Sequence, residues 1–297
     1  MESNNRTAII QEVPAAGDGR PRAAEPEVRY YRRFTIGQRY LHAFLAATFL
    51  VCGVTGLTLR FSNAPWALAL ARSVGGFGTV RFFHLLNAVI MTAAFLTHVF
   101  QVLYRIIVRK EYNLLWGPNS MVPSLKDLKD LLAQFQWFFF RGPRPNFGRY
   151  AYWERIDYWG VFWGMAIIGI SGYAMWFAPG FARILPGWSL NVALILHGEE
   201  AILAMGWIFI IHFFNTHLRP ESFPMDLVIF SGVVTEQELK ERHPEEYRRL
   251  VESGELEKLR VPPPPRWLKN FGWSFGAVAV ATGLVFVVLM IVAFVND

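Results

Sequence analysis

The sequence predicts an all-α integral membrane protein, with a four-helix transmembrane bundle and a fifth, C-terminal transmembrane helix. Of its 297 residues, 53% are hydrophobic, and the apolar residues are collected into five long runs. Each run reaches the ~20 residues that a helix needs to cross a hydrocarbon core of ~30 Å. A helix is the expected spanning form because it satisfies its own backbone polar groups. The runs are residues 40–61, 82–108, 156–178, 190–214 and 271–295.

The basic residues alternate along the chain and predict its orientation. Residues 1–39 carry 7 Lys or Arg, residues 60–83 carry 3, residues 105–155 carry 9, residues 178–189 carry 1 and residues 215–269 carry 9. By the positive-inside rule, the N-terminus is cytoplasmic and the C-terminus lies outside. The net charge of +6 is then explained by orientation and by anionic lipid headgroups, and no nucleic-acid partner is expected.

The first run and the single cysteine exclude some alternatives. The first run is too long for the h-region of a signal peptide and is followed by no small-residue cleavage site, so we expect it to remain as an anchor. Cys52 is the only cysteine and is expected to be a small apolar filler. One cysteine cannot ligate an iron–sulfur cluster or form a c-haem attachment motif, so such a cofactor would belong to another subunit.

The chain divides into four parts. Residues 1–28 are polar and are expected to be a disordered cytoplasmic tail. Residues 29–235 form the four-helix domain, which includes a cytoplasmic loop at 105–155. Residues 236–269 form a charged cytoplasmic helix and a Pro-rich linker, and residues 270–297 form the fifth transmembrane helix.

Two cytoplasmic segments have helical signatures of their own. The stretch "PSLKDLKDLLAQFQWFFF" from Pro123 has leucines at helical spacing and predicts a short helix on the inner membrane surface. The later charged stretch starts with a capping box at Thr235 and Glu238. We expect it to be a solvated helix with a solvated His243, and the prolines from Pro262 to hold the fifth span away from the other four.

Six of the seven histidines lie in or at the edge of the apolar runs, where an ionisable group is costly and marks a functional site by default. A single buried histidine often only bonds across helices, but six together are poorly explained that way. The six are His42, His84, His98, His197, His212 and His217.

The histidine spacing suggests a cofactor. His84 and His98 lie 14 residues apart on the second run, and His197 and His212 lie 15 apart on the fourth, which corresponds to ~21 and ~22 Å along a helix. Both runs cross in the same direction, so facing helices would offer two bis-histidine sites about 20 Å apart. That arrangement suits two b-type haems, each held by two neutral imidazoles. Zinc fits less well, because no cysteine or carboxylate completes a tetrahedral shell.

Two stretches carry a family resemblance. "RYLHAFLAATFLVCGVTGL" in the first run and "LHGEEAILAMGWIFIIHFFNTHLRPESFPMD" in the fourth resemble membrane cytochrome b subunits of respiratory formate dehydrogenases, nickel–iron hydrogenases and related reductases. The resemblance covers about residues 29–235. It implies a four-helix haem-binding bundle in the bacterial or archaeal cytoplasmic membrane, which passes electrons between quinone and an outer-surface subunit. That subunit would be a multihaem cytochrome c, an iron–sulfur protein or a molybdenum or nickel enzyme.

The resemblance also leaves the ligand pairing open. In that family, the first-span histidine usually pairs with the inner histidine of the fourth span, which would join His42 to His212 and leave His98 over. The 14/15 spacing instead resembles cytochrome b of quinol-oxidising bc-type complexes, in which two helices supply all four ligands. His42 and His217 would then form a third pair that either binds a third haem or lines a quinone pocket. The pair of His84 with His197 is common to both schemes.

Charged residues near the histidines are candidates for supporting roles. Arg81 near the outer face and Arg39 near the inner face could bind haem propionates, although arginines also simply extend to the membrane interface. Arg105 and Arg219 are placed similarly at the inner side and are also quinone-site candidates. Glu199 and Glu200, near the outer histidines, are candidates to accept protons from quinol. The four quinone or proton candidates are therefore Glu199, Glu200, Arg105 and Arg219.

The sequence predicts an electron-transfer subunit rather than a stand-alone enzyme, since no nucleophile elbow, phosphate loop or cluster motif is present. Two or three b-type haems would join a quinone site, on the inner side near His42 and His217, to an outer redox partner. The alternative functions are a proton-coupled or metal-ion transporter lined by His and Glu, and a structural anchor for a peripheral complex. A transporter should show inverted repeats or broken spans, and an anchor does not explain the histidine depths.

Overall fold

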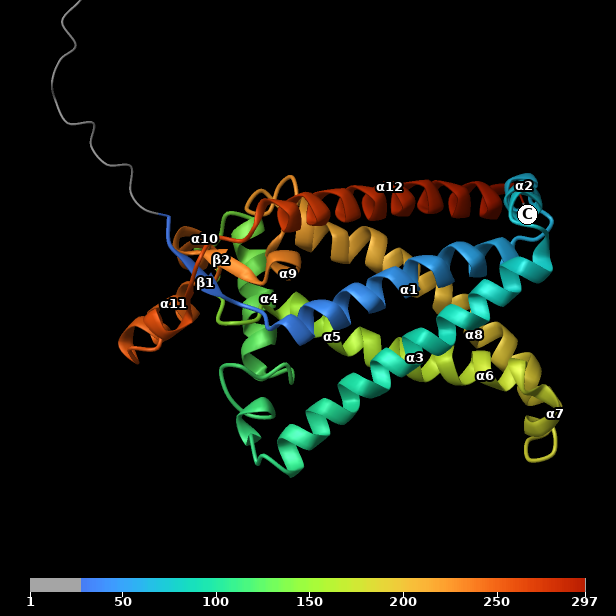
Figure 1. The fold of residues 1–297 in the computed structure, drawn as a ribbon, viewed down its shortest axis with the longest axis horizontal. Helices are drawn as coiled ribbons and strands as arrows, with labels where there is room; N and C mark the ends of the chain where they lie inside the picture. The colour runs from blue at the N-terminus through green and yellow to red at the C-terminus, as the bar shows by residue number, and fades with distance from the viewer. Residues whose placement is uncertain (1–27, 297) are drawn as a thin grey trace, which may run out of the picture.

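Long helices run between two ends of the molecule in the computed structural model, which describes residues 28–296 (Figure 1). The predicted tail, apart from Val28, lies outside the described residues. One end carries a small sheet of β1 (Tyr30–Arg32), β2 (Val233–Thr235) and β3 (Arg260–Val261), and we call it the sheet end. The opposite end carries α2 (Pro65–Ser73) and α7 (Ala178–Phe181), and we call it the loop end.

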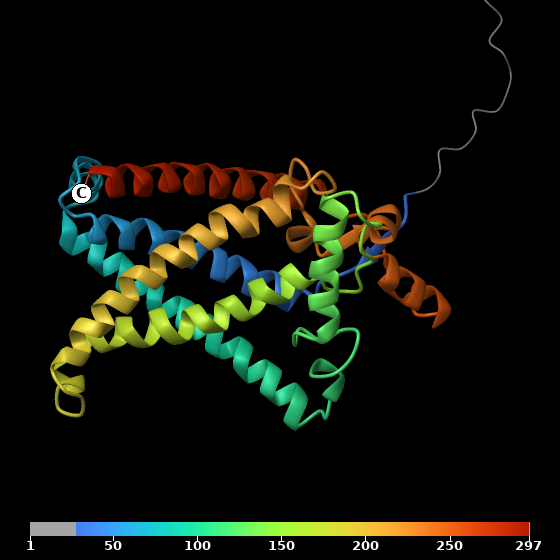
Figure 2. The same cartoon turned by 180° about the vertical axis from the view of Figure 1, so that it is seen from behind.

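Five helical runs connect these ends in alternating directions, so that the C-terminal end of the last lies beside α2 (Figures 1 and 2). Three of the runs are single α-helices, and the other two contain π-helical turns. The runs are α1 (Ile36–Arg60), α3 (Phe77–Ile107), α5 (Tyr152–Gly164) with η2 (Met165–Gly169) and α6 (Ile170–Trp176), α8 (Trp188–Gly206) with η3 (Trp207–His212) and η4 (Phe214–Leu218), and α12 (Arg266–Asn296).

In the described part of the chain, four helices are long and apolar enough to cross a membrane: Ile36–Arg60, Phe77–Ile107, Trp188–Leu218 and Arg266–Val292. The third predicted span, residues 156–178, is not among them. It is rich in Trp, Tyr and Gly and contains η2, yet it forms helix between the same two ends as the others. The predicted fold class, an all-helical membrane bundle with a C-terminal spanning helix, is confirmed, and the small sheet is an addition to it.

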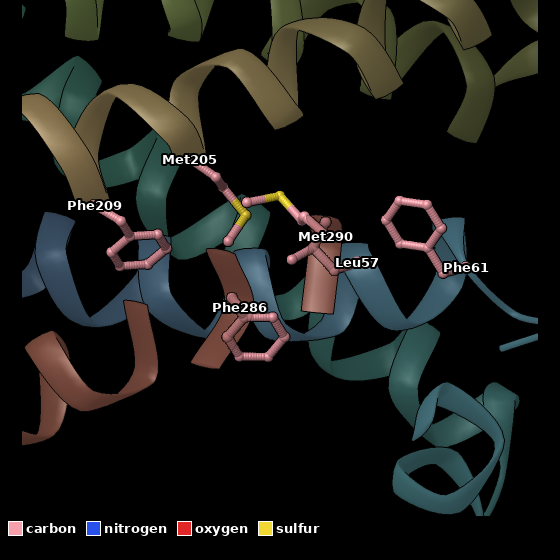
Figure 3. Close-up of a cluster of buried hydrophobic side chains, with 6 residues drawn as sticks. All are labelled: Leu57, Phe61, Met205, Phe209, Phe286 and Met290. Atoms are coloured by element: carbon pink, nitrogen blue, oxygen red, sulfur yellow. The ribbon is translucent and has the colours of Figure 1, made fainter. Parts of the chain in front are cut away.

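The fifth helix packs against the bundle, so the expectation that the prolines hold it apart is wrong. Phe286 and Met290 of α12 pack with side chains of α1, α8 and η3 in one buried cluster, whose members point toward one another (Figure 3). Gly283 lies so close to the ring of Phe209 that a Cβ there would overlap it. Close approach of this kind through small residues is typical of helix contacts in membranes. The six cluster members are Leu57, Phe61, Met205, Phe209, Phe286 and Met290.

The sheet end joins three distant parts of the chain. β1 is the central strand, and it pairs antiparallel with β2 on one side and β3 on the other. Short helices α9 (Val228–Ser231), α10 (Glu236–Arg242) and α11 (Pro244–Glu252) surround it. The predicted capping box of Thr235 and Glu238 begins α10. A second apolar cluster fills this end: Tyr31, Val234, Leu239, Leu250 and Leu256.

A buried ion cluster holds the sheet end together, and His243 belongs to it. The His243 side chain is 7% exposed; its Nδ1 lies 2.8 Å from the Gly148 carbonyl oxygen and its Nε2 lies 3.1 Å from Nη2 of Arg33. The prediction of a solvated histidine is therefore wrong. Glu246, 2% exposed, accepts hydrogen bonds from Arg33 and from Arg149. Charged groups at such depth persist only when they are paired.

The cytoplasmic loop contains the helix predicted from Pro123. α4 (Leu125–Phe138) begins at Ser124 with a capping box to Asp127. One face is fixed to the bundle through the ion pair between Asp127 and Arg155. The opposite face exposes large apolar side chains at helical spacing, as expected for a helix on a membrane surface. These are Leu125, Leu128, Leu132, Phe135 and Phe139. Two short 3-10 turns, η1 (Tyr112–Leu114) and η5 (Glu257–Leu259), complete the described elements.

Candidate functional site

His84 and His197 face each other across the bundle. His84 lies on α3 and His197 on α8, and their ring centroids are 6.1 Å apart with planes at 80°. The two residues are separated by more than a hundred positions in sequence, and the pairing of α1 with α3 and of α6 with α8 brings them together. The structure thus places side by side the two histidines that both sequence schemes paired.

Hydrogen bonds fix the orientation of both rings. Nδ1 of His84 lies 3.0 Å from the hydroxyl oxygen of Thr55, and Nδ1 of His197 lies 2.8 Å from the carbonyl oxygen of Ile168. A carbonyl only accepts, so Nδ1 of His197 carries the proton and its Nε2 keeps a free lone pair. Histidines that bind a metal through one ring nitrogen are usually oriented by a hydrogen bond at the other ring nitrogen.

Two glycines lie against these rings. A Cβ on Gly172 would lie 2.9 Å from Cε1 of His197, and a Cβ on Gly56 would lie 3.2 Å from Cε1 of His84. Real Cβ atoms do not approach ring atoms to 2.9 Å, so residue 172 must lack a side chain for the ring of His197 to lie where it does.

Three further histidines gather nearer the sheet end. His42 on α1, His212 on η3 and His217 on η4 lie near one another. Nδ1 of His212 lies 2.9 Å from Oδ2 of Asp157. The His217 ring is 9% exposed and its Nδ1 has no hydrogen-bond partner among the residues that the structure describes.

His98 makes its contacts with α5 and not with the three histidines near the sheet end. Its Nε2 lies 2.9 Å from the hydroxyl of Tyr158, and its ring packs against Tyr158 and Phe162 on α5. Within residues 28–296, no ring contact or electrostatic interaction joins it to His212. The structure brings His42, rather than His98, to the histidines of the fourth run.

The candidate arginines occupy different surroundings. Arg39 donates from Nε to the Phe230 carbonyl oxygen at 2.8 Å, and Arg105 is exposed and bonded to Glu111. Arg219 is 9% exposed and its guanidinium lies 4.1 Å from the ring centre of Trp153. Burial lowers the pKa of Arg219 to about 10, with Arg144 nearby as the second cause, so Arg219 stays charged near neutral pH. Arg81 is exposed at the loop end.

The two glutamates differ as well. Glu199 is exposed and its Oε1 lies 2.7 Å from Nη2 of Arg60 at the end of α1. Glu200 is half-buried. The guanidinium of Arg60 also lies over Gly198, beside His197.

Sequence reasoning missed four residues that contact the histidines or flank them: Thr55, Asp157, Tyr158 and Arg60. Asp157 had a usable signal, because it is the only acidic residue in the predicted run 156–178 and such a residue is expected to have a partner. Thr55 had none, since a threonine in a spanning helix usually bonds to its own backbone, and Thr55 also does so.

Imidazoles paired between the helices of a membrane bundle are typical of membrane cytochromes b. The chain belongs to one family of that class, because residues 33–218, well over half of its length, match the family described as prokaryotic cytochrome b561, which includes the cytochrome b subunits of nickel–iron hydrogenases and related quinone-linked reductases. No curated protein matches the chain significantly. The protein is accordingly a membrane b-type cytochrome that functions in electron transfer and binds b-type haem.

The residues at the His84–His197 pair fit this cofactor. Two imidazoles that share one metal ion place their ring centres roughly 6 Å apart, since each metal–nitrogen bond is about 2.0–2.1 Å long and each ring adds about 1 Å. The observed 6.1 Å agrees. Two ligands are also the number that an iron porphyrin needs, and the glycines at 56 and 172 let both rings lie directly against the neighbouring helices.

Proposed function

We propose that this chain carries electrons across a prokaryotic inner membrane, between a quinone at the sheet end and a redox partner at the loop end. In this proposal, the sheet end is cytoplasmic, as the basic residues predict, and the loop end faces outward. Haem iron supplies reversible one-electron chemistry at each site. The protein supplies the ligands, their orientation and the low-dielectric surroundings.

The outer site consists of His84 and His197. The single observation that carries the proposal is the 6.1 Å separation of their rings, with both Nδ1 atoms bonded to the protein. In the neutral tautomer that these bonds favour, Nε2 of each ring is the free ligand atom.

For the inner site, we propose His42 and His212 as the ligand pair. His42 lies near His212, and the Asp157 carboxylate lies 2.9 Å from Nδ1 of His212. Carboxylate–histidine contacts raise the basicity of the ligating nitrogen. This assignment follows the family scheme, in which a first-span histidine pairs with the inner histidine of the fourth span.

Two haems fit the histidines better than three. With His42 assigned to His212, a third haem would need His98 and His217 as its ligands. Nε2 of His98 is already bonded to the Tyr158 hydroxyl, and no described contact links His98 to His217. We therefore propose that His98 and His217 have roles other than iron ligation.

The quinone site is proposed between the inner haem and the sheet end. Reduction of a quinone takes two electrons and two protons, and oxidation of the quinol returns them, so the site needs groups that bond to oxygen and exchange protons. His98 with Tyr158 is one group of that kind, and the unpartnered Nδ1 of His217 is another. The direction of electron flow follows from the partner.

The experiment is haem analysis of the purified protein. A reduced-minus-oxidised spectrum should show b-type bands, and pyridine haemochrome analysis should give about two non-covalent haems per chain. His98→Gln and His217→Gln should keep both haems and slow electron exchange with a short-chain quinol. Loss of a haem in His98→Gln would contradict the ligand assignment, and a protein without b-type bands would contradict the whole proposal.

A further inference from the structure

Three arginines at the loop end have no charged partner among residues 28–296. Arg72 on α2, Arg81 on α3 and Arg183 after α7 are exposed, and no ion pair involves them within the described part of the chain. Residues 61–81 and 177–189, which contain them, include no Asp or Glu. The loop-end surface is therefore locally basic.

At the sheet end several arginines are paired, although Arg32, Arg141 and Arg266 are exposed and form no ion pair within the described residues. There, Arg242 pairs with Asp226 and Arg105 with Glu111, and Arg149 pairs with the buried Glu246. The positive-inside rule accounts for many basic residues at the sheet end, but it does not account for unpaired ones at the opposite end. The loop-end arginines thus need another explanation.

Their position points to the histidine pair. Arg81 precedes His84 by less than one turn of α3, and Arg60, at the same end, lies over Gly198 beside His197. Both cartoon views place α2, α7 and the beginnings of α3 and α8 at this end (Figures 1 and 2). Among the described residues, the acidic residues near it are Glu199, which is paired with Arg60, and Glu200.

The same surface exposes large apolar side chains. Ile184 is 85% exposed, Trp188 is 65% exposed and Phe177 is 52% exposed. Arginine together with aromatic residues is the composition enriched at protein interfaces.

We propose that the loop end is a docking surface for an acidic redox protein, with Arg72, Arg81 and Arg183 guiding its electron-transfer centre to the site of His84 and His197. This inference rests on the proposed function and adds the chemistry of the partner to it. Complementary charge of this kind raises association rates and weakens with added salt. The partner accepts or donates one electron at a time through the surface nearest that site.

The test uses charged redox probes on right-side-out membrane vesicles from cells that produce the haem-loaded protein, with vesicles lacking it as the blank. Ferricyanide takes one electron to become ferrocyanide, and hexaammineruthenium(III) is its cationic counterpart. For each probe, the rate of oxidation of the dithionite-reduced protein at low salt is divided by its rate in 1 M salt. This ratio should be larger for ferricyanide than for hexaammineruthenium(III). The triple variant R72Q/R81Q/R183Q should lower the ferricyanide rate about 3- to 10-fold at low salt and raise the ruthenium rate. The difference should vanish at high salt, where charges are screened.

A binding measurement and a control complete the test. Succinylated cytochrome c, an acidic protein, should co-sediment with wild-type vesicles and several-fold less with the triple variant. The matched variant Arg109→Gln, at an exposed arginine of the sheet end, should change neither result. Unchanged rates and binding in the triple variant would overturn the inference and leave the arginines as contacts of lipid headgroups. Absence of b-type bands would instead indicate that the proposed function has failed.

Discussion

Gly172 lies directly against the ring of His197, with its missing Cβ position 2.9 Å from Cε1 of the imidazole. The relationship joins α6 to α8 at the level where His197 faces His84. A methyl group at residue 172 has to move a ring that is fixed by its hydrogen bond to Ile168. The glycine therefore determines where this imidazole lies.

Gly172→Ala should reduce occupancy of the outer haem site, because the displaced His197 ring no longer shares an iron with His84. We expect the haem-to-protein ratio to fall from about two toward one. Gly169→Ala is the matched control, since nothing lies within 4 Å of a Cβ there. Equal haem content in the two variants would contradict the proposed role of Gly172.

Asp157→Asn should change the inner site alone. The carboxylate holds Nδ1 of His212, and its replacement makes the proposed ligand less basic, which disfavours ferric iron. We expect the midpoint potential of the inner haem to rise by roughly 30–60 mV, equivalent to a three- to tenfold change in relative affinity for the two oxidation states. A potentiometric titration should find the outer haem unchanged. A shift in both haems, or in neither, would argue against His212 as an inner ligand.

The sheet end should lose stability in mild acid because of His243. Burial, and then the charge of Arg33, lower the pKa of His243 well below its ordinary value of 6.5. Between these two values the unfolded chain binds a proton that the folded chain excludes, so stability falls as pH decreases below about 6.5. Nε2 also has to stay unprotonated to accept from Arg33.

Hydrogen exchange of α10 and α11, corrected for intrinsic rates, should show lower protection at pH 5.5 than at pH 7.5. The groups that surround His243 are Arg33 from the segment after β1, Arg149, Arg242 at the end of α10, and Glu246 on α11. His243→Gln should be less protected at pH 7.5 and lose little more in acid. Identical pH dependence in both proteins would show that another group is responsible.

Glu246→Gln should disrupt the sheet end much more than a nearby surface change. Removing one partner of a buried ion pair costs roughly 3–5 kcal/mol, and here two arginines, Arg33 and Arg149, lose their common carboxylate. Glu252→Gln is the control on the same helix, because Glu252 is exposed and its ion pair with Arg248 is long, at 4.0 Å. Limited proteolysis should cleave the sheet end of the first variant alone. Equal resistance would mean that the cluster adds little stability.

The membrane helices and the outer histidine pair could be predicted from sequence because both depend on repeating patterns. Apolar length marks the spans, and the 14- and 15-residue spacings place histidines at matched depths. The spacing leaves the choice between His42 and His98 open, since that choice depends on how the helices rotate about their axes. The contact of His98 with Tyr158 is a property of packing that the spacing does not contain.

The sheet end could not be predicted for a related reason. Its strands are only two or three residues long, too short for an alternating pattern to be recognised. His243 and Glu246 lie in a strongly charged stretch that is typical of a solvated helix, and they are buried because Arg33 and Arg149, far away in sequence, fold over them. The packing of α12 against the bundle likewise depends on the close contact between Gly283 and the ring of Phe209.

Counting haem in His84→Ala and His197→Ala, beside His98→Gln, tests the central claim most directly. Each of the first two variants should lose one b-type haem, and the same one by its spectrum and midpoint potential, whereas His98→Gln should keep the full complement. If either single replacement at residue 84 or 197 leaves the haem content of the folded protein unchanged, the two rings do not share an iron and the account is contradicted.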